Sequence, residues 1–394
     1  MNVYEESLKM HQNHKGKLEI TSKVKLTDKT DLTLAYTPGV AEPCRKIAAN
    51  KEDVYKYTIK SNTVAVVSDG SAVLGLGNIG AEAAIPVMEG KAILFKKFAG
   101  VDAFPICLAT QDVNEIVETV VRIAPVFGGI NLEDISAPRC VEVEALLREK
   151  LDIPVFHDDQ HGTAIVVLAA LINGIKLVNK EAAACKVVIN GTGAAGSAIA
   201  KMLSTYGFKN LVLCDKDGVL NLESLEKDAY RLKLMEDLGL KGFEGTLRDA
   251  MKAADIFIGV SAAGVVTQEM VASMNKDAIV LAMANPEPEI MPQLAKEAGA
   301  RIVGSGRSDF DNQVNNVLAF PGIFRGALDV RAICINDEMK IAAAEAIASL
   351  VGEGLSETYI IPSALDERVA DIVADKVAEA AINSGVAQTG DGNE

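Results

Sequence analysis

The sequence predicts an α/β protein with an N-terminal α/β domain, a doubly wound parallel-sheet domain and a closing C-terminal helical segment. From about residue 186 onward, short apolar runs alternate with segments long enough for helices, which is typical of a parallel sheet covered on both faces. After residue 331 the chain is rich in Ala and Glu with helical periodicity. A length of 394 residues fits two or three domains, and we expect their boundaries at 1–160, 161–330 and 331–394.

Short apolar runs between turn-forming residues predict the individual strands. In the first half we expect strands at Thr63–Val67, Ala92–Phe95, Ala103–Ile106 and Pro154–Phe156. Later strands are expected at Val187–Ile189, Leu211–Cys214, Ile256–Val260, Ala278–Met283 and Ile302–Val303. Apolar residues three or four positions apart predict a helix at Glu115–Ile123, and the unbroken apolar run Ala164–Ile172 predicts a buried helix. Two closing helices are expected within 339–350 and 367–382.

Charge, cysteine spacing and hydropathy exclude several classes of protein. The 39 basic and 54 acidic residues give a net charge of −15, which argues against nucleic acid or an anionic membrane as the partner. The six cysteines include no CxxC pair of the kind that binds zinc. The N-terminus lacks the apolar core of a signal peptide, and the longest apolar run is shorter than the ~20 residues of a membrane span. We therefore expect a soluble, reduced, cytoplasmic protein.

A glycine-rich motif indicates a dinucleotide site. The pattern GxGxxG at Gly191–Gly196 follows directly on an expected strand and opens directly into an expected helix at Ser197–Thr205. A pyrophosphate needs this geometry, because bare backbone N–H groups and a helix N-terminus then point at the phosphates. Asp215 ends the next expected strand, where its carboxylate can accept hydrogen bonds from an adenosine ribose. The pattern predicts a Rossmann-like domain in which Asp215 favours NAD over NADP, although Lys216 can offset part of that preference.

Two further motifs resemble functional patterns without matching their geometry. A second GxGxxG at Gly75–Gly80 is separated from its strand by seven residues, so we interpret it as a packed turn beside a site. The segment HDDQH, from His157 to His161, is superficially similar to a zinc-protease motif. Asp158 is shorter than the Glu that such a protease uses as a base, and Gly162 follows directly. A zinc site on one continuous helix is therefore not expected.

Four carboxylates and one lysine near apolar runs are candidates for metal binding or acid–base catalysis. Each of them can instead be an ordinary solvated residue. The pairs Glu133-Asp134 and Asp158-Asp159 offer oxygen ligands that suit Mg²⁺ or Mn²⁺, or they are solvated loops. Lys91 leads into an expected strand and is either a solvated strand end or a base. Partial burial would lower the pKa of its amine toward neutrality and make it a usable base.

Three uncharged polar side chains stand beside turns. Tyr36 precedes a Thr-Pro-Gly turn, where on local grounds it is a packing residue. Asn285 and Asn316 end apolar stretches, where an amide can orient an anion or a carboxamide, or cap a turn.

Eight segments, in chain order, resemble the motifs of the malic enzymes, and specifically of their short bacterial branch. They are AYTPGVAEPC, VVSDGSAVLGLGNIG, IPVMEGKA, GGINLEDISAP, VFHDDQHGTA, INGTGAAG, MANPEPE and QVNNVLAFPGIFRGA. The resemblance runs from about Tyr36 to Asp329. Members of this family oxidatively decarboxylate malate to pyruvate and CO₂ with NAD or NADP and a divalent metal, so the resemblance implies that activity here.

The resemblance also implies a role for each candidate residue. Tyr36 would be the general acid and Lys91 the general base, paired with Asp158, while Mg²⁺ or Mn²⁺ would be held by the other carboxylates. The implied metal ligands are Glu133, Asp134 and Asp159. The implied cofactor residues are Gly191, Thr192, Gly193, Ala194, Ala195, Gly196 and Asp215, with Asn285 and Asn316 at the nicotinamide and the substrate. Relatives form dimers, which implies a homodimer in which the segment around Tyr36 reaches a neighbour.

The sequence departs from the larger branch of the family in one segment, and two functions other than oxidative decarboxylation stay open. The larger branch of the family grips a malate carboxylate with an arginine in the segment matching Gly70–Val73, but this chain has Ser71-Ala72 there. Recognition of that carboxylate then falls to Ser71 or to backbone donors. The first alternative function is a malolactic-type enzyme that keeps its cofactor and yields lactate, which product analysis would separate. The second is a non-catalytic protein that binds a dinucleotide.

Overall fold

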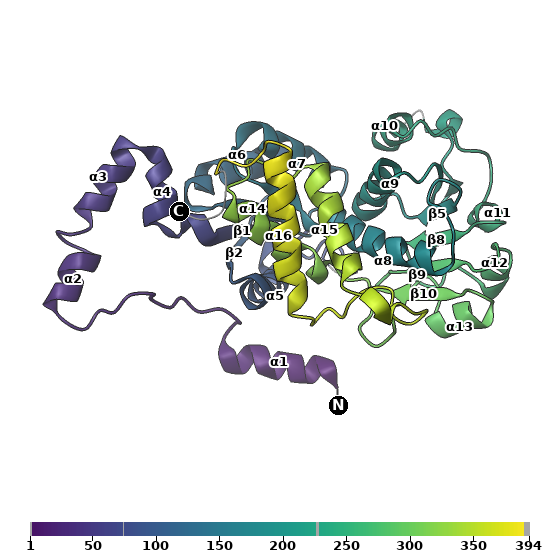
Figure 1. Ribbon diagram of the computed structural model, residues 1–394, viewed down its shortest axis with the longest axis horizontal. Coiled ribbons are helices and arrows are strands. Elements are labelled where there is room, and N and C mark those ends of the chain that lie inside the picture. The colour runs from purple at the N-terminus through teal and green to yellow at the C-terminus, as the bar shows by residue number, and fades with distance from the viewer. Residues whose placement is uncertain (1, 74, 226–227, 390–394) are drawn as a thin grey trace.

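The described part of the chain contains two sheets, of which the first is a four-stranded parallel sheet (Figure 1). The computed structural model describes residues 2–73, 75–225 and 228–389. In this sheet the strand order is β2-β1-β3-β4. The strands are β1 (Thr63–Ser68), β2 (Asp102–Cys107), β3 (Gly129–Leu132) and β4 (Val155–His157). The central strands β1 and β3 are buried along their whole length, as expected for a parallel sheet with helices on its faces.

The second sheet has six strands in the order β10-β9-β8-β5-β6-β7. They are β5 (Lys186–Asn190), β6 (Asn210–Asp215), β7 (Gly218–Val219), β8 (Ile256–Gly259), β9 (Ile279–Ala282) and β10 (Ile302–Ser305). All pairings are parallel except that of β6 with the edge strand β7. The strand order reverses at β5, which pairs with β6 on one side and β8 on the other. Ligands of doubly wound sheets bind at such a reversal, outside the carboxyl ends of the strands.

Helices cover both sheets and join them. The first 150 residues contain α1 (Val3–His14), α2 (Lys29–Ala35), α3 (Ala41–Ala49), α4 (Val54–Tyr57), α5 (Ala81–Ala99), α6 (Val113–Ile123) and α7 (Arg139–Lys150). The second sheet is accompanied by α8 (Thr163–Leu177), α9 (Ala194–Tyr206), α10 (Ala229–Asp237), α11 (Leu247–Met251), α12 (Gln268–Ala272) and α13 (Pro292–Glu297). The closing helices are α14 (Phe320–Asp329), α15 (Asp337–Ser349) and α16 (Arg368–Asn383).

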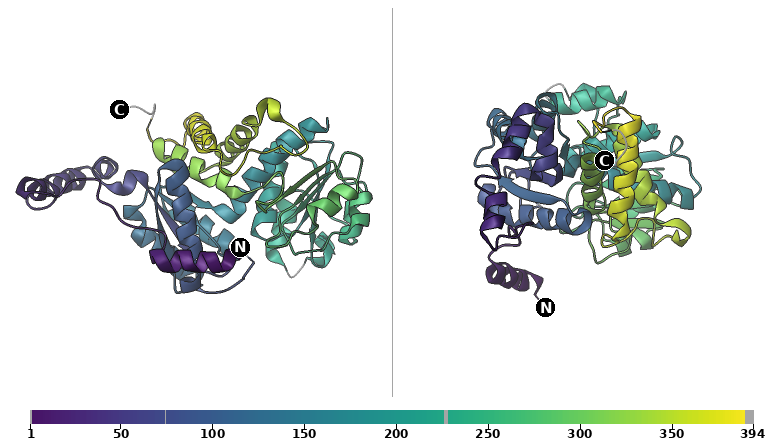
Figure 2. Two further views of the ribbon diagram at one scale, coloured as in Figure 1. Left: turned by 90° about the horizontal axis from the view of Figure 1, so that it is seen from below. Right: turned by 60° about the vertical axis from the view of Figure 1, so that its left-hand side comes forward.

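One apolar core connects the two sheets. It contains Val64 of β1, Leu168 of α8, Val187 of β5 and Phe324 of α14. The left view of Figure 2 shows the yellow C-terminal helices lying over the junction of the two sheet units. Within the described part of the chain, only Asp158–Leu177 is long and apolar enough to cross a membrane. Most of that stretch is buried, as in the core helix of a globular protein.

The expected strand at Ala92–Phe95 is wrong, because these residues lie inside the 19-residue helix α5. Ala92 and Phe95, three positions apart, are buried, whereas Ile93 between them is 38% exposed. A short apolar run cannot be assigned to strand or helix by periodicity alone. The other expected strands and helices are confirmed, with ends that differ by a few residues. The glycine motif opens into α9 at Ala194, three residues earlier than expected.

The N-terminal residues form an extended arm rather than part of the core. Helices α1 to α4 contain no buried residue. In Figure 1 and in the left view of Figure 2, α2 and α3 project away from the body of the molecule. Lys17 ties the base of the arm to α5, because its amide donates to Glu89 Oε2 at 3.1 Å and its Nζ donates to the Pro86 carbonyl at 2.6 Å.

Candidate active site

The first sheet brings acidic side chains together at the carboxyl ends of neighbouring strands. Glu133 and Asp134 follow directly on β3, and Asp158 follows directly on β4. Since β3 and β4 are parallel and paired, these ends meet at one edge of the sheet. Asp158 and Asp159 belong to a single π-helical turn, η4 (Asp158–Gly162), which leads into α8.

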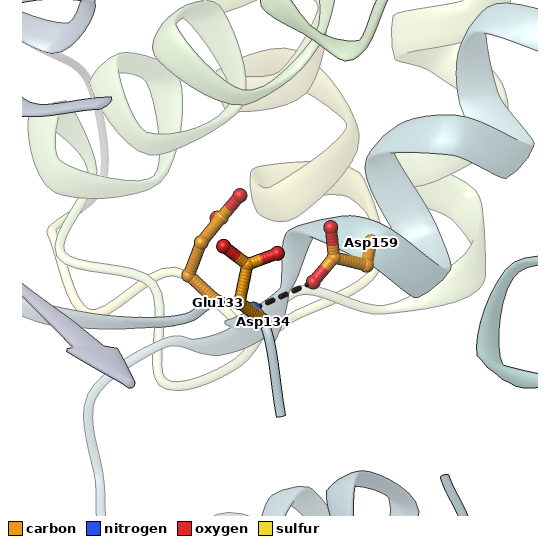
Figure 3. Close-up of side chains that lie close together, drawn as sticks. All are labelled: Glu133, Asp134 and Asp159. Atoms are coloured by element: carbon orange, nitrogen blue, oxygen red, sulfur yellow. Dashed lines mark hydrogen bonds between the residues drawn. The ribbon is translucent and has the colours of Figure 1, made fainter. Parts of the chain in front are cut away.

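Three of these carboxylates form a compact oxygen cluster. One oxygen each from Glu133, Asp134 and Asp159 lies within 4.8 Å of the others (Figure 3). The amide of Asp134 donates to Asp159 Oδ2 at 2.8 Å, which fixes the two loops against each other. Glu133 Oε2 accepts a hydrogen bond from Asn131 Nδ2 at 2.9 Å, which orients the Glu133 carboxylate. An all-oxygen set of this kind fits Mg²⁺ or Mn²⁺ and does not favour a soft metal.

The electrostatics of the cluster support the same assignment. Burial, together with the nearby carboxylate of Asp159, raises the pKa of Glu133 to about 7. Burial, together with the nearby carboxylate of Asp158, raises the pKa of Asp159 to about 6. Crowded carboxylates that resist ionisation would be stabilised in their charged form by a divalent cation.

Lys91 lies on α5 between two of the carboxylates. Its Nζ is 2.6 Å from Asp158 Oδ2 and 2.8 Å from Glu133 Oε1, and it stands 4.2 Å from the ring centroid of Phe320. Burial alone would lower the pKa of this ammonium, but Asp158 and Glu133 outweigh burial and raise the pKa above its ordinary value. The expectation that burial would lower the pKa of Lys91 is therefore wrong for this arrangement of charges.

Asp158 links Lys91 to the second half of the chain. Its Oδ2 accepts a hydrogen bond from Asn316 Nδ2 at 2.5 Å, in addition to the bond from Lys91. Asn316 begins a short 3₁₀ turn, η6 (Asn316–Leu318), just before α14. Burial raises the pKa of Asp158 to about 7. The predicted pairing of Asp158 with Lys91 is thus present, and Asn316 belongs to the same network.

Ser71 lies at the edge of this site, where its hydroxyl is already engaged. The Ser71 hydroxyl donates to Asp69 Oδ1 at 2.5 Å and accepts from the amide of Ser136 at 2.9 Å. Arg139, which no local sequence pattern marks, donates to Asp69 Oδ2 at 2.8 Å and to Ser136 Oγ at 2.9 Å. These bonds tie the loop after β1 to the loop after β3, so that Ser71 helps to hold the carboxylate-bearing loop in place.

The glycine motif forms the floor of a groove in the second sheet unit. The groove has a volume of about 590 Å³, and its lining includes Gly191, Thr192, Gly193, Asp215 and Arg231. A Cβ at Gly196 would lie 1.8 Å from the Gly191 carbonyl, so only glycine allows the helix to start this close to the strand. A Cβ at Gly193 would meet no described atom within 4 Å, so the loop offers open space beside its backbone.

Asp215 is held in an ion pair that the sequence did not reveal. Arg231 on α10 contacts the Asp215 carboxylate, and its Nε donates to Thr192 Oγ1 at 3.0 Å. The Thr192 hydroxyl in turn donates to Asp215 Oδ2 at 3.0 Å. No local pattern marks Arg231, because its function depends on α10 folding back over the end of β6. The groove therefore presents an acid and a guanidinium side by side.

Asn285 lies in the loop that follows β9. This loop is fixed by Glu289, a fully buried carboxylate that accepts from the amides of Ser261 at 2.7 Å and Ala284 at 3.0 Å. A Cβ at Gly75 would lie 2.9 Å from the Asn285 carbonyl. The second glycine motif thus packs against the Asn285 loop, in line with its interpretation as a packed turn beside a site.

The two histidines of HDDQH lie on different elements. His157 ends β4, whereas His161 belongs to η4, and His161 Nε2 is 2.9 Å from both carboxylate oxygens of Glu144. Within residues 2–73, 75–225 and 228–389, the three-carboxylate cluster is the only group of ligating side chains found close enough to share a metal.

Tyr36 is separated from the other candidate residues in the single chain. It follows directly on α2 in the projecting arm, and its side chain is 67% exposed. Figure 1 shows α2 far from α5, which carries Lys91. The other candidates lie after the carboxyl ends of strands, on α5 and in the turns η4 and η6.

Comparison with known proteins extends over nearly the whole chain. Residues 15–148 match the family model "Malic enzyme, N-terminal domain", and residues 160–382 match "Malic enzyme, NAD binding domain". The bifunctional malic/malolactic enzyme of Bacillus subtilis is 58% identical, over 98% of this chain and 95% of that protein. The NAD-dependent malic enzyme of Geobacillus stearothermophilus is 54% identical, over 98% of this chain and 81% of that protein.

A solved structure agrees with these matches. The malic enzyme of Pyrococcus horikoshii superposes with a TM-score of 0.94 at 51% identity, over 99% of this chain and 93% of that one. Such similarity leaves no support for a non-catalytic protein that merely kept the fold. With two family models covering most of its length, and with relatives above half identity over almost all of it, this chain belongs to the malic enzyme family.

Proposed function

We propose that this protein oxidatively decarboxylates malate to pyruvate and CO₂ while reducing NAD⁺ or NADP⁺, with Mg²⁺ or Mn²⁺. The observation that carries this proposal is the contact of the Lys91 amine with Asp158 and with Glu133, a member of the three-carboxylate cluster. A hydroxy acid held beside the cluster would present its C2 hydroxyl to that amine. The dinucleotide groove of the second sheet unit would hold the hydride acceptor.

The metal would be held by Glu133, Asp134 and Asp159, whose oxygens already converge. When bound, it supplies a Lewis acid that polarises the C2 oxygen and neutralises a substrate carboxylate. Malate carries two negative charges in a protein with a net charge of −15, so a local cation is needed to gather it.

Lys91 is the general base in the proposed reaction. The base must be the neutral amine, and a divalent cation at the carboxylate cluster would favour it by offsetting the negative charge that raises the pKa of Lys91. As Nζ of the neutral amine takes the proton of the C2 hydroxyl, a hydride leaves C2 for the nicotinamide ring and the C2 carbon becomes a carbonyl. The bond between C3 and the adjacent carboxylate then breaks and releases CO₂, leaving its electron pair as an enolate. Throughout these reaction steps, Asp158 and Asn316 would hold the amine in position beside the substrate.

Tyr36 is the proposed general acid that protonates the enolate carbon, and we propose that it acts across a homodimer. The arm that carries it buries none of its helical residues and exposes a series of large apolar side chains. Among them are Leu32, Leu34 and Val40. Apolar surface of this extent favours association, and a second copy would cover it while receiving Tyr36.

The remaining binding roles follow from the geometry of the groove and the loops. Residues Gly191 to Gly196 would bind the pyrophosphate at the N-terminus of α9, and Asp215 would accept hydrogen bonds from the adenosine ribose. Asn285 and Asn316 would contact the nicotinamide side and the substrate. Because the Ser71 hydroxyl is engaged by Asp69 and Ser136, a malate carboxylate would be recognised by backbone donors near Ser71.

We further propose the boundaries 1–160, 161–330 and 331–394, with the active site in the cleft between the first two parts. Closure of that cleft would exclude water during the chemistry. All six cysteines are free thiols, which supports a reducing, cytoplasmic setting.

A malolactic reaction is the second candidate, because the relative from Bacillus subtilis is named a bifunctional malic/malolactic enzyme. In that reaction the protein would keep its reduced cofactor and return the hydride to the keto acid, giving lactate.

One assay tests both proposals. Purified protein with malate, Mn²⁺ and NAD⁺ or NADP⁺ is followed by absorbance of the reduced cofactor and by quantifying pyruvate and lactate. Pyruvate and reduced cofactor in equal amounts support the malic reaction, and lactate without net reduced cofactor supports the malolactic one. Absence of both products with both cofactors would contradict the proposed function.

A further inference from the structure

Asp69 is a buried carboxylate that the proposed reaction does not use. It follows directly on β1 and is 1% exposed. Its Oδ1 accepts from the Ser71 amide at 2.9 Å and from the Ser71 hydroxyl at 2.5 Å. Its Oδ2 accepts from Arg139 Nη1 at 2.8 Å. A buried charge is tolerated only where hydrogen bonds and an opposite charge compensate it, so the chain around Asp69 must keep these partners in place.

The guanidinium of Arg139 joins the loops that follow three neighbouring strands. Besides Asp69 after β1, it donates to the Gln111 carbonyl after β2 at 2.5 Å and to Ser136 Oγ after β3 at 2.9 Å. The Ser136 amide donates to the Ser71 hydroxyl at 2.9 Å, which closes the network. The loop after β1 is therefore fixed from the strands on both of its sides.

The same network reaches the carboxylate cluster through the backbone of Asp134. The Ala72 amide, directly after Ser71, donates to the Asp134 carbonyl at 2.9 Å. Asp134 has a φ of 53°, a left-handed conformation that residues other than glycine adopt uncommonly. In an extended strand the side chains of Glu133 and Asp134 would point to opposite faces. The left-handed backbone at Asp134 instead lets both carboxylates join one cluster with that of Asp159 (Figure 3).

We propose that Asp69 and Arg139 are positioning residues for the divalent metal. They would hold the loop after β1 against Asp134 and so keep the Asp134 carboxylate directed at the cation, without contacting the cation themselves. This inference rests on the metal site of the proposed function. Altering a residue that orients a metal ligand typically weakens metal binding by about 10- to 100-fold.

The sign of the effect separates positioning from charge. Arg139→Met removes a positive charge near the cluster, which on charge alone would strengthen the binding of a cation. It also removes the donors to Asp69 and Ser136, so we expect it to bind Mn²⁺ at least about tenfold more weakly. Ser71→Ala removes the hydroxyl that links Asp69 to Ser136 and changes no charge. It should also weaken Mn²⁺ binding.

Titration of the unaltered protein and the variants with Mn²⁺ tests the inference, with free Mn²⁺ measured by electron paramagnetic resonance. Substrate and dinucleotide are left out, so the result does not depend on turnover. Lys180→Met is the matched control, because Lys180 also forms a partly buried ion pair with a carboxylate, that of Asp255 in the second sheet unit. This control should bind Mn²⁺ as the unaltered protein does.

Two results would overturn the inference. An Mn²⁺ affinity equal to or above that of the unaltered protein, in Arg139→Met or in Ser71→Ala, would overturn it and leave the proposed metal site standing. If circular dichroism shows that one of these variants does not fold, the other decides. An unaltered protein that binds no Mn²⁺ would overturn the proposed metal site together with the inference.

Discussion

The amine of Lys91 and the carboxylate of Asp158 lie 2.6 Å apart, although 67 positions of sequence separate the two residues. Asn316, from beyond the second sheet, donates to the same oxygen of Asp158. The proposed base is therefore held jointly by the two halves of the chain. A change in the position of one half relative to the other would move the amine, so the proposed closure of the cleft would act on the chemistry through Asp158.

Replacement of the base tests its role most simply. Lys91→Ala should lower kcat by roughly 10²–10⁴-fold, as expected for loss of a positioned general base, with little change in the affinity for NAD⁺. Initial rates measure kcat, and isothermal titration with NAD⁺ measures its affinity. Lys97→Ala, at an exposed position of the same helix paired with Glu367, is the matched control and should keep its rate. Equal rates in Lys91→Ala and the control would remove Lys91 from its role.

Removal of one carboxylate should abolish the metal site without unfolding the protein. Saturating Mn²⁺ at about 100 times its dissociation constant should stabilise the unaltered protein by about 2.7 kcal/mol. In Asp159→Asn this gain in thermal stability should vanish, while the stability in EDTA should not fall, because one of three crowded charges is gone. Asp152→Asn, at an exposed position, should respond to Mn²⁺ normally. A full Mn²⁺ response in Asp159→Asn would place the metal elsewhere.

The ion pair between Asp215 and Arg231 predicts how cofactor preference can be changed. Asp215→Ser removes the acid that repels a 2′-phosphate and frees the guanidinium to bind it. The ratio of kcat/KM for NADP⁺ to that for NAD⁺ should rise at least about tenfold. Adding Arg231→Ala to this variant should cancel the gain, and Glu236→Gln on the same helix should leave the ratio unchanged. A ratio that does not move in Asp215→Ser would show that the ribose binds elsewhere.

The buried pair of Glu144 and His161 predicts a pH dependence of stability. Burial alone would raise the pKa of Glu144, but His161 and Lys340 outweigh it and lower that pKa to about 2. The pKa of Glu144 in the unfolded chain is about 4.3, so its ionised form stabilises the fold above that pH. This contribution, about 3 kcal/mol at pH 7, is lost as the pH falls toward 2.

Glu144→Gln should therefore destabilise the protein most at neutral pH. The difference in unfolding free energy from the unaltered protein should be about 3 kcal/mol at pH 7 and roughly half of that at pH 3. Chemical unfolding followed by circular dichroism at pH 7, 5 and 3 gives the comparison. A difference that stays constant across this range would contradict the assigned charge of Glu144.

Mixing of two inactive variants tests whether Tyr36 acts across a dimer. Tyr36→Phe and Lys91→Ala should each be nearly inactive alone. After subunit exchange in equal amounts, about half of the dimers are mixed, and one of the two sites in each mixed dimer carries both residues. About a quarter of the unaltered activity should return. If each chain used its own Tyr36, no site in any dimer would be complete and no activity would return.

The sequence predicted the features that depend on local order. Strands of the second sheet appear as short apolar runs, and the glycine motif is recognisable because a close approach of helix and strand excludes every other residue. No strand was expected before Glu133, so the meeting of these carboxylates at the ends of β3 and β4 was implied only by the family resemblance. The family resemblance assigned residue roles that spacing alone left open.

The features that the sequence did not predict depend on packing between distant segments. Lys91 was expected to precede a strand because the four apolar residues Ala92–Phe95 fit a strand or a helix equally well. Only the packing of α5 against the rest of the protein makes them helical. The raised pKa of its amine depends on two carboxylates more than 40 positions away. Arg231 and Arg139 reach their partners through tertiary folding, so no local motif marks them.

Crystals grown with Mn²⁺, malate and a reduced cofactor, with the metal located by anomalous scattering, test the central claim most directly. We predict a single Mn²⁺ per site, within about 2.5 Å of oxygens from Glu133, Asp134 and Asp159, with Lys91 Nζ at hydrogen-bond distance from the C2 hydroxyl of malate. A cation bound away from these three carboxylates, or a malate hydroxyl out of reach of Lys91, would contradict the account.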